Sequence, residues 1–175
     1  KYGDDFDWMY DHAENGYSFD SEYMYGFDMR PNIDPETGQP YRSVTVEDLI
    51  HNIQTYTTKA KEAGKKYFIY VVDSFDSLSS NAEMARNDKA MKAADKGEEI
   101  KEGTYNLEKQ KKINEFFRVG IDKVEIENFM LIVVSQVREN IGVMYGDKYN
   151  WHAKKALKFY SSQQIFLTEV EGIKV

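Results

Sequence analysis

The sequence has no cysteine, only three prolines, and no apolar run near the length of a membrane span. Without cysteine, a disulfide framework, a thiol nucleophile and a thiolate metal site are all excluded, and a reducing cytoplasmic location is expected. A spanning helix needs about 20 apolar residues, so no membrane partner is expected. The net charge of −7 argues against a nucleic-acid binder that relies on bulk positive charge. A local basic loop could still bind DNA.

The 175 residues are 41% hydrophobic, which predicts one folded domain. Eight acidic residues lie among the first thirty, but nine aromatic residues accompany them. A solvated acidic tail would not be so aromatic, so this segment is expected to fold. Because the chain lacks an initiating Met and ends within an apolar-alternating run, we expect a fragment truncated at both ends.

Two helices are expected from apolar residues at helical spacing. The first follows Thr45, a possible N-cap, and stops at Gly64. The second runs from about 105 to 118 and buries three apolar side chains: Leu107, Ile113 and Phe117.

Continuous apolar runs over 67–72 and 129–134 predict two strands buried on both faces, and 164–170 predicts a third strand. Helices and strands alternate, so the predicted class is α/β with a largely parallel sheet and flanking helices. The charged segment 79–103 is expected to be a mobile loop with at most one helical turn, and 138–152 a second loop. All three prolines lie in 31–41, which reads as a connection.

Polar pairs follow both predicted buried strands, Asp73-Ser74 after the first and Ser135-Gln136 after the second. Ligands of parallel sheets gather at the carboxyl ends of strands. A rigid Asp in this place suits a magnesium–nucleotide site. Capping of the following turn explains an Asp there equally well, so the strand pattern alone leaves both readings open.

The segment 135–160, SQVRENIGVMYGDKYNWHAKKALKFY, closely resembles the RecA recombinase family. In that family a Gln at a strand end opens the second DNA-binding loop, similar here to Ile-Gly-Val-Met-Tyr-Gly at 141–146. An Ala-Leu-Lys-Phe-Tyr run at the subunit interface follows, matched at 156–160. The resemblance implies a single partial RecA-like P-loop ATPase core over 1–175, with the second DNA-binding loop at 137–155.

The resemblance extends towards the N-terminus. Val-Val-Asp-Ser at 71–74 is similar to the family's Walker B strand, and Tyr-Asp-His-Ala-Glu at 10–14 resembles the strand end with the catalytic Glu. The match of 106–118 to the helix after the first DNA-binding loop implies that this loop lies within 79–104. Simple hydration of the charges there remains the alternative reading.

The resemblance implies a role for each matched residue. Catalysis would use Glu14 to order water and Gln136 to sense the γ-phosphate, while Asp73 and Ser74 would bind the ATP cofactor, with Asp73 serving Mg²⁺ through water. Basic residues and aromatic rings on the second loop would bind single-stranded DNA, and residues after it, in a short segment over 156–159, would contact a neighbouring subunit of a homo-oligomer, filament or ring. The DNA-binding set is Arg138, Tyr145, Lys148, Trp151, Lys154 and Lys155, and the interface set is Lys158 and Phe159.

The sequence departs from the family in three places. Ala153-Lys154 stands where the family usually has Gly-Gly, and Ser135 where it commonly has Asn. No G-x-x-x-x-G-K-[ST] phosphate-binding loop occurs, so this chain should bind ATP poorly and be inactive alone. The parent protein is expected to carry that loop and act as a DNA-dependent ATPase.

Two functions therefore remain open. One is an ATP-dependent recombinase core that pairs single-stranded DNA with a homologous duplex in recombination and repair, as in phage-borne relatives of the family. The other is a non-hydrolysing paralogue that anneals or loads DNA. A hexameric motor of the same fold is less consistent with the runs at 141–146 and 156–160.

Overall fold

The structure is a computed structural model. It describes residues 3–14, 20–26, 42–97, 107–139, 141, 146, 149–151 and 153–167. The predicted proline-containing connection at 31–41 lies outside these residues. None of the helices in the described ranges is long and apolar enough to cross a membrane.

The centre of the fold is a parallel sheet of three strands in the order β1-β2-β3. β1 spans Phe6–His12, β2 spans Tyr67–Asp73 and β3 spans Asn128–Val133. In register, His12 lies opposite Asp73, so β1 and β2 end at the same level of the sheet. The predicted α/β class with a parallel sheet is confirmed, and the shared edge collects the residues that follow each strand.

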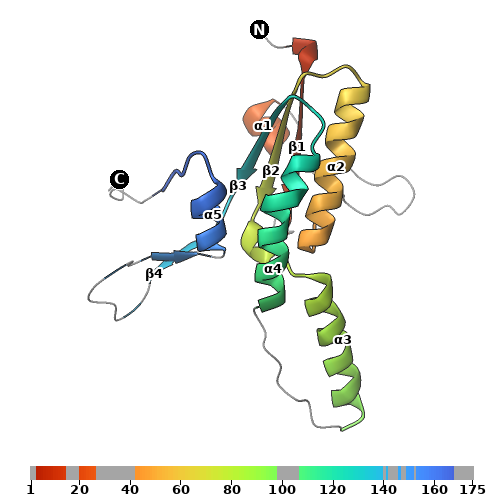
Figure 1. Ribbon diagram of the computed structural model, residues 1–175, viewed down its shortest axis with the longest axis vertical. Coiled ribbons are helices and arrows are strands. Elements are labelled where there is room, and N and C mark those ends of the chain that lie inside the picture. The colour runs from red at the N-terminus through yellow and green to blue at the C-terminus, as the bar shows by residue number, and fades with distance from the viewer. Residues whose placement is uncertain are drawn as a thin grey trace.

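Two helices cover one face of this sheet: α2, Val46–Glu62, and α4, Leu107–Glu115. Figure 1 shows them side by side against the strands. Every second residue of β2 is buried, whereas β3 alternates between half-buried and exposed. Met130 remains 54% exposed on the uncovered face. The prediction that both strands are buried on both faces is therefore wrong, because the described helices α2 and α4 pack along one face of the sheet.

α2 begins and ends where the sequence indicates. Thr45 and Asp48 form a reciprocal capping box, in which the Thr45 hydroxyl accepts from the Asp48 amide and the Asp48 carboxylate accepts from the Thr45 amide. Gly64, with a φ of 76°, follows the last turn in the left-handed conformation that glycine adopts without steric cost. The helix buries five side chains, namely Val46, Leu49, Ile53, Thr57 and Ala60.

α4 and the π-helical turn after it, η3 (Phe116–Gly120), complete the core. Ile113 and Phe116 are fully buried, while Phe117 is only half-buried. The rings of Phe116 and Phe117 pack on Phe75, which follows β2, with centroid distances of 6.5 Å from Phe116 and 6.1 Å from Phe117. The predicted helix is confirmed. Phe116 and Phe117 share the burial that was expected of Phe117, because the π-helical turn changes the direction in which each side chain leaves the helix.

The charged segment after β2 departs from the sequence prediction. Residues Asn81–Asp95 form α3, a fifteen-residue helix with a capping box between Ser80 and Glu83. It buries no side chain and extends beyond the sheet (Figure 1). The predicted mobile loop over 79–103 is therefore wrong for 81–95, because capping and helix-forming residues specify a helix without an apolar stripe. Residues 98–106 lie outside the described ranges.

The C-terminal third also differs in part from the sequence prediction. β4 (Val137–Glu139) pairs antiparallel with β5 (Tyr149–Trp151), so the ends of the predicted second loop form a short hairpin. α5 spans Lys154–Tyr160 and contains the run matched at 156–160. Residues 161–167 form no strand. The predicted strand at 164–170 is therefore wrong over its described part, where the side chains are exposed and no strand pairs with it.

Candidate functional site at the ends of the strands

Three residues predicted from the sequence meet at the carboxyl edge of the sheet. Glu14 follows β1, Ser74 follows β2 and Gln136 follows β3. The Ser74 hydroxyl and the Gln136 side-chain amide both donate to Oε1 of Glu14, the latter at 3.0 Å. One carboxylate oxygen thus joins the ends of all three strands. Ser74 is buried, whereas Glu14 and Gln136 are exposed and accessible to a ligand.

Asp73 lies beside this group but is held by another residue. The Tyr10 hydroxyl donates to Oδ2 of Asp73 at 2.6 Å, and the amide of Glu14 donates to the Asp73 carbonyl at 3.3 Å. The Asp73–Ser74 peptide bond is cis. Asp73 is half-buried, and among the described residues its carboxylate accepts from Tyr10 and from no amide of the following turn, whose N-cap is Ser74. The turn-capping alternative is therefore not what fixes its carboxylate here.

Asp76 supplies a second attachment for Gln136. Its Oδ2 accepts the main-chain N–H of Gln136 at 2.8 Å. The main chains run together just before this point, since the Phe75 amide donates to the Val134 carbonyl at 2.9 Å. Gln136 is therefore fixed through its backbone by Asp76 and through its side chain by Glu14.

The residues at this edge carry metal-ligating oxygens and hydrogen-bond donors of the kinds that line one side of a magnesium–phosphate site. Asp73 and Glu14 supply carboxylate oxygens, and the Gln136 amide supplies N–H groups for a phosphate. Within the described ranges no group of three or more His, Cys, Asp or Glu side chains could hold a metal. Mg²⁺ commonly binds through one or two carboxylates, with waters and substrate phosphates completing its shell. The set is compatible with such a role, which requires a phosphate-bearing ligand.

A buried polar network underlies the site. Asp11 is fully buried on β1 and accepts hydrogen bonds from the Ser43 amide at 2.8 Å, the Ser43 hydroxyl and the Tyr70 hydroxyl at 2.6 Å. Burial, together with the charge of Asp11, holds the pKa of Tyr70 above its ordinary range. Asn52 of α2 donates to the Ser43 hydroxyl at 3.1 Å. The network ties β1, β2 and α2 together below the strand ends.

The predicted DNA-binding residues lie on the hairpin and on α5. Arg138 is exposed on β4, and Lys155 is exposed on α5. The Lys154 ammonium lies 4.7 Å from the Trp151 ring centroid, and that of Lys158 lies 5.5 Å away. Trp151 therefore already has two cations near its ring, so base stacking on it would compete with these contacts.

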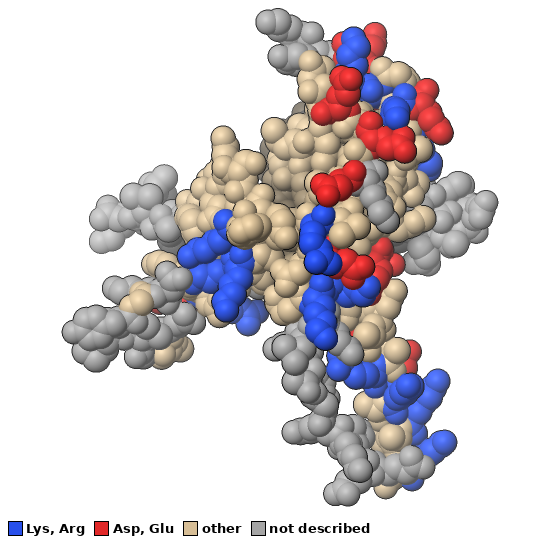
Figure 2. Space-filling model, viewed as in Figure 1, with Lys and Arg blue, Asp and Glu red and all other residues tan. Residues whose placement is uncertain are grey.

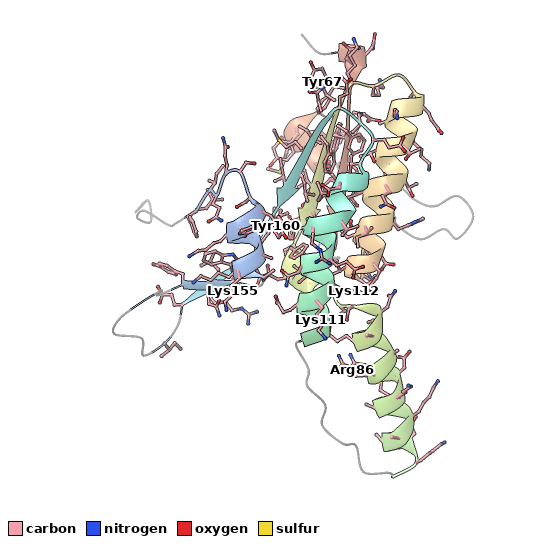
Figure 3. The ribbon with its side chains drawn as sticks, viewed as in Figure 1. Tyr67, Arg86, Lys111, Lys112, Lys155 and Tyr160 are labelled. Atoms are coloured by element: carbon pink, nitrogen blue, oxygen red, sulfur yellow. The ribbon has the colours of Figure 1, made fainter. Side chains whose placement is uncertain are left out.

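Basic side chains gather on the face drawn in Figure 2, over α5 and along α4 and α3. Figure 3 places Lys155 on the α5 side, and Lys111 and Lys112 on α4. Lys112 is paired with Glu115 at 3.0 Å, whereas α5 carries three lysines and no acidic residue. Of the predicted DNA-binding lysines, Lys154 and Lys155 therefore lie on α5, where no acidic residue accompanies them.

The remaining predictions concern Phe159 at the expected subunit interface and Ala153, where the sequence departs from the family. Phe159 is 79% exposed on α5, and its neighbour Tyr160 points towards the α4 side (Figure 3), where it stacks on Phe117 at 5.4 Å. Ala153, which stands where the resemblance implies a glycine, has a φ of 55°. This left-handed conformation is one that glycine adopts more readily. Tyr145 and Lys148 lie outside the described residues.

Sequence reasoning missed Tyr10 and Asp76 as parts of the site. Tyr10 carried no signal for its partner, because its contact with Asp73 depends on the register of β1 against β2. Asp76 carried none, because its contact depends on how the turn after β2 meets the end of β3.

Comparison of the chain with models of known protein families gives no match, and comparison with curated proteins gives none either.

Proposed function

We propose that this chain is part of a RecA-like ATPase core that binds single-stranded DNA for homologous pairing and strand exchange. The observation that carries the proposal is the contact of Gln136 with Glu14 at 3.0 Å, with Ser74 on the same oxygen. These residues were selected by resemblance from three separate parts of the sequence. Their convergence at one edge of a parallel sheet supports a shared role, because ligands of such sheets bind there.

In this proposal each residue acts through its present surroundings. Glu14 orients the attacking water, and Ser74 holds the carboxylate in place. Asp73, positioned by Tyr10, serves Mg²⁺ through water. The bound Mg²⁺ would neutralise charge on the phosphates of ATP. Gln136 exchanges its bond to Glu14 for one to the γ-phosphate, and this exchange changes the conformation of the segment that begins at 137.

The polynucleotide would lie against the hairpin and α5. Arg138 and Lys155 are exposed and available to phosphates, and such contacts give binding that depends on salt and tolerates any sequence. Lys154 and Lys158 are oriented by Trp151, so the ring positions cations in addition to any stacking.

A homo-oligomer, filament or ring, is part of the same proposal. Phe159 is 79% exposed, and burying so large an apolar ring between subunits would be favourable. Lys158, which is also exposed, precedes it on the same helix. A cytoplasmic location is the corresponding proposal for a DNA-recombination protein without cysteine.

A non-hydrolysing paralogue that anneals or loads DNA is the second candidate. The feature that discriminates the two is G-x-x-x-x-G-K-[ST], which these 175 residues do not contain. Its presence in the parent protein favours the recombinase, and its absence from the parent favours the paralogue. Without the lysine and backbone amides of that motif, the carboxyl edge of this sheet contacts only part of a nucleotide. The DNA surface would be the same for both candidates.

Measurements of ATP binding and hydrolysis separate the two candidate functions. They are made with single-stranded DNA present, in a form of the protein extended upstream to include any phosphate-binding loop. The recombinase proposal predicts DNA-stimulated turnover that Glu14→Gln abolishes while nucleotide binding is kept. Glu22→Gln, a matched change at an exposed residue of α1 (Ser21–Tyr25), should leave turnover intact. Turnover retained in Glu14→Gln rules out the assignment of Glu14 as the residue that orients the attacking water. DNA binding with no turnover in the unaltered protein supports the paralogue.

A further inference from the structure

Arg42 reaches the turn that carries Glu14. Its Nη1 atom donates to the Ala13 carbonyl at 3.4 Å, although Arg42 and Ala13 are 29 positions apart in the sequence. Ala13 is buried directly after β1, and its own amide donates to the Asp11 carbonyl at 3.1 Å. Arg42 is half-buried, and a hydrogen bond is electrostatically stronger in such a place than in water. The residue before Glu14 is therefore held by a guanidinium group from another part of the chain.

The backbone next to Arg42 is attached at two points. The following residue, Ser43, is fully buried and donates both its amide, at 2.8 Å, and its hydroxyl to the carboxylate of buried Asp11. The carbonyl of Val44 accepts the Ser79 amide at 2.9 Å. Arg42 thus extends from a segment that is bound to the end of β1 and to the chain after β2, so the reach of its side chain is well defined.

Glu14 depends on its backbone for its place in the site. Its side chain is exposed, and its amide donates to the Asp73 carbonyl at 3.3 Å. The backbone of residues 13 and 14 is therefore held by Arg42 and by the end of β2. A small movement of this turn would carry the Glu14 carboxylate away from Ser74 and Gln136, which both donate to it.

We propose that Arg42 is a positioning residue: by holding the Ala13 carbonyl, it fixes the turn that carries the carboxylate of Glu14. The guanidinium group suits this role, because a charged donor makes a stronger hydrogen bond than a neutral donor does. In this role Arg42 acts through the backbone of Glu14 and contacts neither nucleotide nor metal. The inference deepens the proposed function and rests on it for the task of Glu14, but its first test needs no nucleotide.

Amide hydrogen exchange in the 175-residue chain, followed by NMR, measures how firmly the turn is held. The amide of Glu14 reports opening of the turn. The amide of Val134, which donates to the Val72 carbonyl at 3.0 Å, reports opening of the adjacent sheet. The ratio of the two exchange rates separates a local effect at the turn from a general loss of stability, because a general loss affects both amides.

Arg42→Met keeps an apolar stem and removes every donor. We expect it to raise the Glu14-to-Val134 exchange ratio about fivefold, the size of effect that loss of one hydrogen bond produces. Arg42→Lys keeps a charged donor and should stay close to the original ratio. Arg118→Met, the same change at an exposed arginine of η3, is the matched control and should leave the ratio unchanged. Equal ratios in Arg42→Met and Arg118→Met would overturn the positioning role.

A measurement on the unaltered chain replaces this comparison if Arg42→Met fails to fold. A guanidinium group held by a hydrogen bond rotates more slowly about its Cζ–Nη bonds than a solvated one, so its Nη–H protons give separate NMR signals at low temperature. We expect separate signals for Arg42 and one averaged signal for exposed Arg118. An averaged signal for Arg42 would contradict the hydrogen bond, and with it the proposal.

Turnover in the upstream-extended protein then tests whether the turn matters for the chemical step. Arg42→Met should lower kcat about tenfold and leave KM for ATP unchanged, because a displaced Glu14 orients water poorly. Arg42→Lys should restore most of kcat. Unchanged kcat in Arg42→Met would overturn the positioning role, whether or not KM rises. Absence of turnover in the unaltered extended protein would count against the proposed function, and the exchange ratio would still decide whether Arg42 holds the turn.

Discussion

The side-chain amide of Gln136 lies 3.0 Å from Oε1 of Glu14, and the two residues are 122 positions apart in the sequence. Ser74 donates to the same oxygen. A ligand that draws Gln136 away must break this bond and leave Glu14 with Ser74 alone. In the proposed function, this exchange links the conformation of the chain after β3 to ligand binding at the strand ends.

The contact between Gln136 and Glu14 can be tested without a ligand. Gln136→Glu would place two carboxylates side by side, so its free energy of unfolding should be lower than that of Gln136→Ala by about 0.5–1 kcal/mol. Both side chains are exposed, so the difference should shrink in 1 M NaCl. Urea unfolding at low and high salt measures it. Equal stabilities of the two variants at low salt would contradict the contact.

Tyr70 should make the fold sensitive to alkaline pH. Burial and the charge of Asp11 raise its pKa in the folded protein, so the folded state keeps a proton that the unfolded chain loses above about pH 10. Stability should therefore be constant below that pH and fall above it by about 1.4 kcal/mol per pH unit for this group. The difference in unfolding free energy between the unaltered chain and Tyr70→Phe, followed from pH 8 to 11, isolates the effect.

Tyr70→Phe should also cost about 1–3 kcal/mol at pH 7, because buried Asp11 loses a donor. Tyr23→Phe, at a tyrosine that is 88% exposed, serves as the control and should change neither value. A Tyr70→Phe profile parallel to that of the unaltered chain above pH 10 would rule out the assigned role of burial.

The two capping boxes should differ in their effect on stability. Thr45→Ala removes the cap of α2, a helix with five buried residues, and should lower the global free energy of unfolding by about 1 kcal/mol. Ser80→Ala removes the cap of α3, which buries none, so that helix should open locally without a change in global stability. Thermal unfolding, combined with amide exchange across 81–95, separates the outcomes. A loss of global stability with Ser80→Ala as large as that with Thr45→Ala would show that α3 is part of the cooperative core.

Local signals predicted the elements that lie in the core. α2 has a cap, an apolar face and a terminal glycine, and the apolar runs of β2 and β3 are longer than any turn would allow. α3 has no apolar periodicity to indicate a helix, because a helix without buried residues does not need it. Its Ser80-to-Glu83 capping box was the signal present in the sequence.

Contacts that depend on tertiary packing could not be predicted in the same way. An apolar strand has the same sequence whether one or both faces are covered, so the exposure of Met130 follows only from where the helices lie. At the site, resemblance selected Glu14 and Gln136, and the shared edge of a parallel sheet explains why they meet. The contact of Tyr10 with Asp73 depends on the register of β1 against β2.

Binding of a fluorescently labelled oligo(dT) to the chain, measured by anisotropy over a series of salt concentrations, tests the proposed function most directly. Arg138→Ala and Lys155→Ala should each weaken binding and reduce the slope of log affinity against log salt by about 0.7, the value for one phosphate contact on a single strand. Lys59→Ala, at an exposed lysine on α2, should leave the slope unchanged. No binding at low salt, or an unchanged slope in both Arg138→Ala and Lys155→Ala, would contradict a DNA surface on the hairpin and α5.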